Sequence, residues 1–172
     1  HFYPEDYYEE AKRCVKELGF VALKITPIAH ACHPSSRDAY YVYEVCRELK
    51  VPLMIHTGNG IPFADPTSVY QGAADHPDVP VILAHAGSES FNQQARILAA
   101  KLDNVFLEPS WCGTNAVKHM IEEVGCDKIL FSSDNFDQIP VELAKYRQII
   151  KNEDDLEKVM WKNAVRIFNL KL

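Results

Sequence analysis

Short apolar runs recur along the chain, and each is followed by a stretch with helical spacing. The runs begin near residues 20, 52, 80, 105 and 129. Their apolar positions are continuous rather than alternating, which is typical of strands covered on both faces. The pattern therefore predicts strands at residues 20–25, 51–58, 79–87, 105–108 and 128–134.

The segments between these runs repeat apolar side chains at i, i+3 and i+4, which predicts helices. Ser36 is the expected N-cap of the helix over residues 36–49. The other predicted helices cover residues 4–18, a short stretch ending at 75, 90–102, a stretch ending at Gly125, 140–150 and 154–170. Strand starts 24 to 32 residues apart are those of βα units, which need a parallel sheet with right-handed crossovers.

Two α/β architectures accommodate five βα units. One is a doubly wound sheet, and the other is part of an eight-stranded (β/α)8 TIM barrel of about 250 residues. No glycine-rich phosphate loop follows the first run, which weakens the nucleotide-binding version. Candidate functional residues at the ends of three strands favour the barrel, whose active sites draw on several strands.

Composition narrows the choice of partners. The 172 residues suit one domain, with 18 basic and 24 acidic residues, a net charge of −6 and no basic cluster, so nucleic acid is not expected as a partner. No apolar run approaches the roughly 20 residues of a membrane span. Five cysteines without zinc-finger spacing predict a soluble cytoplasmic protein. Because the chain begins at His1 without a methionine, a missing N-terminal segment is expected. A homo-oligomer is the alternative expectation for its partners.

The chemistry concentrates at three strand ends, where His56, His85 and Asp134 each follow an apolar run. In a parallel sheet all three lie on one rim. Neutral imidazole and carboxylate are the groups that a divalent Zn or Mn site uses. A buried carboxylate costs several kcal/mol unless it is paired or metal-bound, so Asp134 is expected to have a partner.

The chain resembles the amidohydrolase superfamily, specifically its amidohydrolase-related branch. The resemblance rests on GFVALK at 19–24, LMIHTG at 53–58, ILAHAG at 82–87, LFSSD at 130–134 and KNAVRIFNL at 162–170. It implies that residues 1–172 are the C-terminal part of a (β/α)8 barrel and supply its fourth to eighth strands. The His-x-His pair of that family's first strand is absent from this sequence, and Thr26 stands where a histidine is common at the end of the fourth strand.

The resemblance also implies roles for the candidate residues. His56 would be a metal ligand, and Asp134 a ligand that also handles the proton of a metal-bound water. His85 would lie at the same metal site as a polarising or acid–base residue. Lys24 is a candidate as a carboxylated lysine bridging two metals, but a lysine paired with a carboxylate inside the barrel is the favoured interpretation. The expected metal is Zn, with Mn as the second choice.

Four other histidines are given ordinary roles. His30 and His33 are interpreted as loop residues within reach of substrate rather than as a His-x-x-His metal site. His76 and His119 are expected on the surface.

Three further residues lie at the end of the run at 105–108 or just beyond it, on the same rim. Glu108 is noted there without a role. Trp111 is a candidate wall of a substrate pocket, although a packed aromatic is the favoured interpretation. Cys112 has no evident activating base, so it is not predicted to be a nucleophile.

These expectations combine into a metal-dependent hydrolase of a small amide, ester or lactone. Metal-bound water would be the nucleophile, Asp134 would accept its proton, and His85 would polarise the substrate carbonyl. Two alternatives stay open. One is a metal-dependent decarboxylase or other lyase on the same scaffold, and the other is a non-catalytic fragment that binds no metal.

Overall fold

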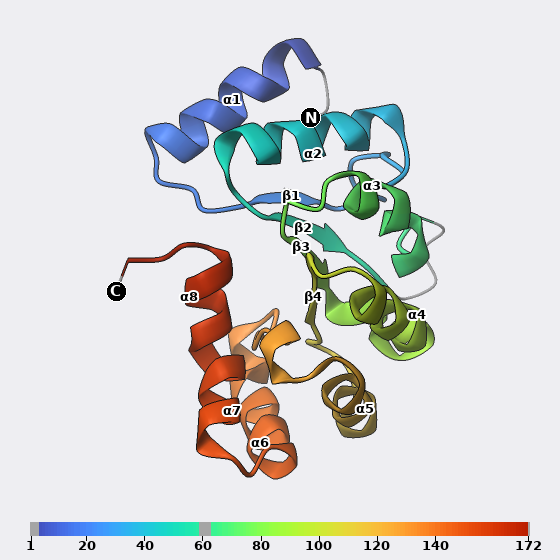
Figure 1. Cartoon of the computed structure of the whole chain (residues 1–172), viewed down its shortest axis with the longest axis vertical. Coiled ribbons are helices and arrows are strands. Elements are labelled where there is room, and N and C mark those ends of the chain that lie inside the picture. The colour runs from blue at the N-terminus through green and yellow to red at the C-terminus, as the bar shows by residue number, and fades with distance from the viewer. Residues whose placement is uncertain (1–3, 59–62, 172) are drawn as a thin grey trace.

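The computed structural model describes residues 4–58 and 63–171, so residues 59–62 of the predicted loop after Gly58 lie outside it. Four parallel strands form one sheet in the order β1-β2-β3-β4. The strands are β1 (Leu23–Ile25), β2 (Leu53–His56), β3 (Val81–Ala84) and β4 (Val105–Glu108). The expected α/β class with a parallel sheet is confirmed (Figure 1).

Helices follow every strand. They are α1 (Pro4–Lys16), α2 (Arg37–Leu49), α3 (Tyr70–Asp75), α4 (Ser88–Lys101), α5 (Thr114–Val124), α6 (Ile139–Ile149), α7 (Glu153–Glu157) and α8 (Asn163–Ile167). Short 3-10 turns are η1 (Pro66–Val69), η2 (His85–Gly87), η3 (Cys126–Lys128) and η4 (Phe136–Gln138). Ser36 caps α2 as predicted, because its hydroxyl accepts a hydrogen bond from the Ala39 N–H at 3.2 Å. Within the described part of the chain, no helix has the length and apolar character needed to cross a membrane.

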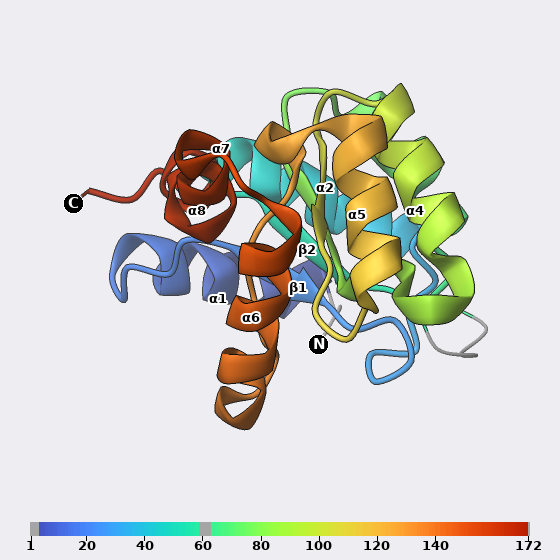
Figure 2. The same cartoon turned by 90° about the horizontal axis from the view of Figure 1, so that it is seen from below.

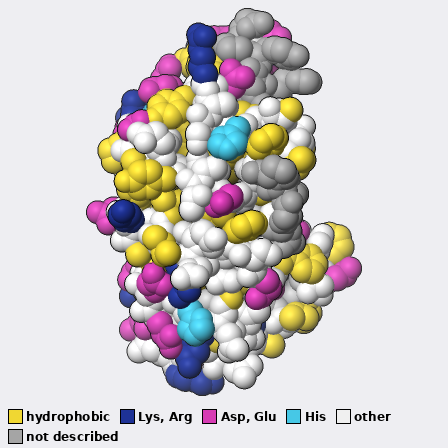
Figure 3. Space-filling view, turned by 90° about the vertical axis from the view of Figure 1, so that its right-hand side faces the viewer, with side chains coloured by type: hydrophobic (Ala, Val, Ile, Leu, Met, Phe, Trp, Pro, Cys, Tyr) yellow, Lys and Arg dark blue, Asp and Glu magenta, His cyan; other side chains and the backbone are white. Residues whose placement is uncertain are grey.

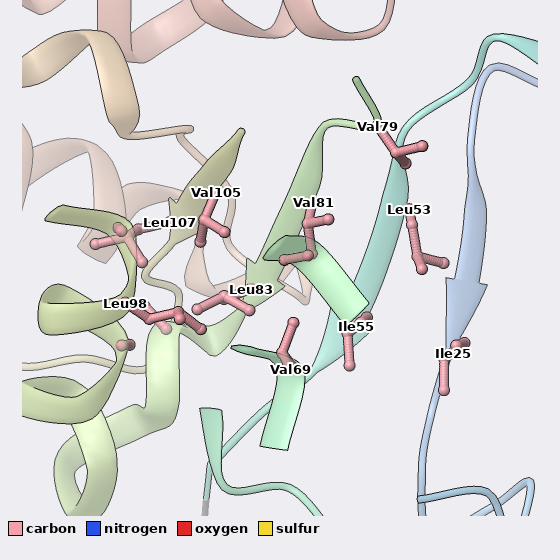
Figure 4. Close-up of a cluster of buried hydrophobic side chains, with 14 of the residues drawn as sticks. Ile25, Leu53, Ile55, Val69, Val79, Val81, Leu83, Leu98, Val105 and Leu107 are labelled. Carbon is pink, nitrogen blue, oxygen red and sulfur yellow. The ribbon is translucent and has the colours of Figure 1, made fainter. Parts of the chain in front are cut away.

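The pleat of the strands divides their side chains between two faces of the sheet. One face contributes to the main core, with Leu23, Ile25, Leu53, Ile55, Val81, Leu83, Val105 and Leu107 all buried. These side chains pack against helix residues such as Val69 and Leu98 (Figure 4). Helices α2, α4 and α5 lie on this side of the sheet, as the view from below shows (Figure 2). The sheet is therefore covered on this face by the helices that connect its own strands.

The opposite face carries a smaller apolar cluster. Ile82, Phe106 and Leu130 are buried there against Ile167 at the end of α8, with Met54 and Phe168 at the margin. Two cations lie over the Phe106 ring, with Lys128 Nζ 5.5 Å and the Arg166 guanidinium 5.4 Å from its centroid. The C-terminal helical segment therefore closes part of the second face.

The fifth predicted strand, residues 128–134, is reduced to one bridge between Ile129 and Leu107. Lys128 does not begin a strand, because it ends η3 and donates from Nζ to carbonyls at the end of α4, including that of Leu102 at 2.8 Å. Beyond the bridge, the Phe131 N–H bonds to the Val159 carbonyl at 3.0 Å. A helix thus takes the place of a neighbouring strand at this position.

The carbonyl of Val159 reaches Phe131 from a π-helical segment, Lys158–Lys162, between α7 and α8. Here the Asn163 N–H bonds to the Lys158 carbonyl five residues back. The Asn163 side chain is buried and donates from Nδ2 to the carbonyls of Cys126 and Ile129, both at 2.7 Å. The predicted helix over 154–170 is therefore three consecutive segments: α7, the π-helical segment and α8. Val159 and Asn163, at the middle of this stretch, form hydrogen bonds with the backbone of residues 126–131.

Glycine is required where the loops after β2 and β3 meet. The Thr57 hydroxyl donates to the Ala84 carbonyl at 2.8 Å and accepts from the Gly87 N–H at 2.9 Å. Gly58 has φ +105°, and a Cβ there would lie 2.4 Å from Ser88 Oγ. Thr57 and Gly58 thus bring together the two loops that follow His56 and His85.

The surface over α3, α4 and α5 carries hydrophobic, acidic and basic side chains intermingled (Figure 3). Lysine and arginine side chains on this face are separated from one another rather than joined in a continuous patch.

Replacing Asn163 with alanine should lower the free energy of unfolding by about 2–4 kcal/mol, because two buried carbonyls lose their donor. Urea unfolding measures the change. Asn115→Ala, at an exposed position of α5, is the control and should change stability by less than about 0.5 kcal/mol. Equal midpoints for the two variants would contradict the role given to Asn163.

Replacing Gly58 with alanine should cost about 2–4 kcal/mol, because the new Cβ meets Ser88 at a backbone angle that alanine disfavours. Gly19→Ala separates the two effects, since Gly19 has φ +73° but no atom within 4 Å of the position that a Cβ would occupy. We expect that control to cost about 1 kcal/mol. Similar losses in both variants would show that close approach to Ser88 is unimportant.

Candidate functional site

His56 and His85 lie side by side at the carboxyl ends of β2 and β3. Their ring centroids are 4.8 Å apart, and the ring planes cross at 72°. The parallel register sets this proximity, because His56 pairs with Ala84, the residue before His85. His85 is buried, whereas His56 is partly exposed. Two imidazoles expected to share one rim are thus in contact.

Burial and neighbouring charges keep both rings neutral. Burial is the main cause that lowers the pKa of His85 to about 4; the nearby His56 and Lys24 lower it further, and Asp134 opposes them. Burial also lowers the pKa of His56, aided by Lys24 and again opposed by Asp134. Neutral imidazoles are the form that accepts a proton or ligates a metal.

Asp134 lies close enough to act electrostatically on both histidines, but it is exposed rather than buried. Its Oδ2 accepts a hydrogen bond of 2.9 Å from Trp111 Nε1. The expectation of a packed Trp111 is therefore wrong, because its side chain is 47% exposed and its indole N–H holds the carboxylate. Asp134 does have a partner, but the burial from which that partner was predicted is not found.

The buried carboxylate of the site is Glu108, to which the sequence pattern alone assigns no role. Glu108 is 5% exposed at the end of β4. Its Oε2 accepts from the His85 N–H at 3.1 Å, and its Oε1 accepts from the Ser110 N–H at 2.8 Å. Burial raises the pKa of Glu108, while the hydrogen bonds from Ser110, His85 and Ser132 act against that rise.

Ser110 completes this network, and nothing in the sequence pattern singles it out. It is fully buried, and its hydroxyl lies 2.7 Å from His85 Nδ1. The sequence feature that could have pointed to Ser110 is Glu108, because a carboxylate at the end of an apolar strand needs hydrogen-bond donors nearby. A hydroxyl two residues further along the chain is an obvious supplier of one.

Cys112 is buried, and its thiol donates to the His85 carbonyl at 3.3 Å. Burial raises the pKa of Cys112 to about 12, so the thiol stays protonated. This agrees with the prediction that Cys112 is not a nucleophile.

Lys24 lies on β1, where it pairs in register with Met54 of β2. Its side chain is exposed, and its charge reaches His56 and His85. The carboxylate partner expected for Lys24 is not found within residues 4–58 and 63–171. A role for Lys24 at a metal stays a prediction.

Two of the remaining histidines form hydrogen bonds with nearby backbone. His30 Nδ1 accepts from the Thr26 N–H, and His33 Nδ1 accepts from the Ser35 N–H, both at 3.1 Å, so each ring stabilises a turn. His119 is exposed as expected.

The expected surface position of His76 is wrong. This residue is 1% exposed, stacks on Tyr43 and bonds to the Gly72 carbonyl and the Glu44 carboxylate. Its position at the end of α3 turns the ring inward, towards α2.

Backbone strain gathers at this rim. His85, Ala86, Ser88, Trp111 and Asp134 all have positive φ values, between 41° and 67°. Left-handed conformations cost non-glycine residues about 1 kcal/mol or more each, and they tend to persist at functional sites. The rim is therefore held in shape by the surrounding hydrogen bonds.

The donor chemistry fits part of a metal site. His56 and Asp134 supply an imidazole and a carboxylate, which suit a divalent ion such as Mn or Zn. Among the residues that the structure describes, however, no three His, Cys, Asp or Glu side chains are grouped so that they could hold an ion. A complete ligand set would need groups besides these.

Comparison with curated proteins finds similarity to a decarboxylase and to a hydratase. The chain is 26% identical, over 220 aligned positions, to the gamma-resorcylate decarboxylase of Polaromonas sp. (strain JS666 / ATCC BAA-500), with 97% of this chain and 67% of that protein covered. The chain is also similar, over a shorter stretch, to the 2-keto-4-carboxy-3-hexenedioate hydratase of Sphingobium sp. (strain NBRC 103272 / SYK-6). This match is 40% identical over 72 residues and covers 38% of this chain and 21% of that protein.

Among solved structures, the chain resembles a dihydroxybenzoic acid decarboxylase from Polaromonas sp. JS666 with bound manganese and the inhibitor 2-nitroresorcinol. The TM-score is 0.73 at 21% identity, and the match covers 97% of this chain and 66% of that one. The likeness supports the TIM-barrel type of fold, of which the parallel sheet described here is a part. The chain spans about two thirds of the length of the two decarboxylases.

These similarities overturn the predicted hydrolase. Proteins that align over nearly the whole chain include decarboxylases, so the alternative of a lyase on the same scaffold is the better supported one. Zinc receives no specific support either, since the similar structure contains manganese.

The family itself is clear from a broader match. The model of the amidohydrolase family matches residues 2–170, which include His56, His85 and Asp134 at the rim of the sheet. The chain belongs to the amidohydrolase family.

Proposed function

We propose that this protein is a metal-dependent decarboxylase of a hydroxylated aromatic acid. The alignment of 97% of the chain with a gamma-resorcylate decarboxylase is the observation that carries the proposal. The rim agrees with it, because two neutral imidazoles and a carboxylate meet there and can hold or move protons.

Decarboxylation sets one clear demand on the protein. The bond between the ring carbon and the carboxylate breaks, CO₂ leaves, and the electron pair stays on the ring carbon. That carbon must then receive one proton, so the site needs a group that delivers a proton there. Asp134 is the titratable group proposed to pass a proton from solvent to that carbon, and the neutral His85 ring can accept a proton beside it.

Asp134 has one oxygen fixed by the protein. Trp111 donates to Oδ2, which orients the carboxyl group, and in this proposal Oδ1 is the oxygen that carries the proton. His56 and Asp134 are the residues proposed to hold the metal. When bound, a divalent cation supplies positive charge that orients an anionic substrate. Mn is the first choice, because a similar structure contains it.

A hydratase is the second candidate, favoured by the 72-residue match to a hydratase at 40% identity. Hydration of a carbon–carbon double bond also requires a proton on carbon, so the same residues would serve. The two reactions differ in their products, since one releases CO₂ and the other adds water.

Decarboxylation carried out in D₂O with Mn²⁺ and gamma-resorcylate should release CO₂ and leave a single deuterium on the carbon that lost the carboxylate. Mass spectrometry and proton NMR of the product measure both. Related hydroxybenzoates form the panel if gamma-resorcylate is not turned over. Addition of water to an unsaturated acid, without CO₂ release from any panel member, would favour the hydratase and defeat the decarboxylase.

Asp134→Asn should lower kcat by about 10³-fold, because the amide cannot carry the proton. Metal content is measured in parallel, so that loss of the ion can be separated from loss of proton transfer. Asp137→Asn removes an exposed carboxylate from η4 and should leave kcat unchanged. A metal-loaded Asp134→Asn protein with wild-type kcat would rule out the proton-transfer role.

A further inference from the structure

Three buried groups form a chain that ends on the imidazole of His85. The Glu108 carboxylate accepts hydrogen bonds from both the His85 and Ser110 backbone N–H groups. The Ser110 hydroxyl in turn lies 2.7 Å from His85 Nδ1. The direct separation of Nδ1 from Glu108 Oε2 is 4.0 Å, too long for a hydrogen bond, so Ser110 is the link between them.

The directions of the first two hydrogen bonds are fixed. A backbone N–H can only donate, so one lone pair on each Glu108 oxygen is already used as an acceptor. The hydroxyl groups of Ser110 and Ser132 also lie near enough to this carboxylate to lower its pKa, while burial raises it. These donors favour the ionised carboxylate, which has lone pairs for all of them and no proton of its own, and they oppose the effect of burial on its pKa.

The direction of the third hydrogen bond is set by the first two. With Glu108 ionised, the Ser110 hydroxyl gives its proton to the carboxylate and turns a lone pair towards His85. The Nδ1 atom must then carry the proton that this lone pair accepts. In the opposite direction, Ser110 would aim its proton at Nδ1 and leave its own lone pairs facing a buried negative charge, which is unfavourable.

We propose that Glu108 and Ser110 are positioning residues that hold His85 in the Nδ1–H tautomer, so that Nε2 is the bare, proton-accepting nitrogen. The inference deepens the decarboxylase proposed above, since it states what His85 brings to that site. It also departs from the role first expected for His85. A neutral ring without a proton on Nε2 accepts a hydrogen bond there and cannot polarise a carbonyl by donating one.

Glu108→Gln is the variant that reverses the chain. The glutamine amide can donate to the Ser110 oxygen, which frees the Ser110 proton for Nδ1 and moves the ring proton to Nε2. Ser110→Ala removes the link, and the ring should then populate the Nε2–H form as well. Ser132→Ala is the matched control, because Ser132 acts on the same carboxylate, whereas the hydroxyl found within hydrogen-bond distance of His85 Nδ1 is that of Ser110.

The experiment is long-range proton–nitrogen NMR of the ¹⁵N-labelled full chain at pH 8 with a metal chelator present, where an ordinary histidine is neutral. The His85 signals are identified by their absence from His85→Asn. In wild type and Ser132→Ala we expect a protonated Nδ1 and a bare Nε2. In Glu108→Gln and Ser110→Ala we expect the Nε2–H form to appear, with backbone amide spectra that remain dispersed.

A wild-type His85 carrying its proton on Nε2 would overturn the proposal. So would an unchanged tautomer in well-folded Glu108→Gln and Ser110→Ala proteins. These measurements need no substrate, so they separate the two proposals. The expected tautomers without any CO₂ release would leave the positioning role intact and defeat only the decarboxylase.

Discussion

The parallel register of the four strands is the constraint on which the site depends. Because β2, β3 and β4 pair residue for residue, their carboxyl ends arrive at one edge in step, and His56, Ala84 and Glu108 form one row across the sheet. A shift of one residue in any strand would send one of these side chains to the opposite face. The row exists only because the apolar residues on the other face fix that register within the core.

A single buried charge organises the loops that leave this row. Glu108 accepts hydrogen bonds from the backbone of both the β3 and the β4 loops, and those loops contain left-handed residues at His85 and Trp111. Burying a carboxylate is costly unless donors surround it. The strained loops and the buried charge thus support each other, since the hydrogen bonds offset part of both costs.

Much of this arrangement could be predicted from the sequence, and the failures share a cause. Apolar runs identified four strands, and their regular spacing identified the parallel sheet. The fifth predicted strand, by contrast, is reduced to a bridge at Ile129, because the Phe131 N–H bonds to the Val159 carbonyl of a helix distant in sequence. His76 and Ser110 were missed for the same reason, because their burial is decided by neighbours from other parts of the chain. Local pattern carries information about a residue's own element and little about its tertiary partners.

The π-helical turn at Lys158–Lys162 has an evolutionary consequence. One extra residue in a helix is usually read as an insertion that can be lost again. Here the Val159 carbonyl is bonded to Phe131, and Asn163 holds two carbonyls beyond it. Deleting a residue would tighten the turn and rotate everything after it by about 100°. Ile167 would leave its place against Phe106, so this segment should tolerate substitutions far better than changes of length.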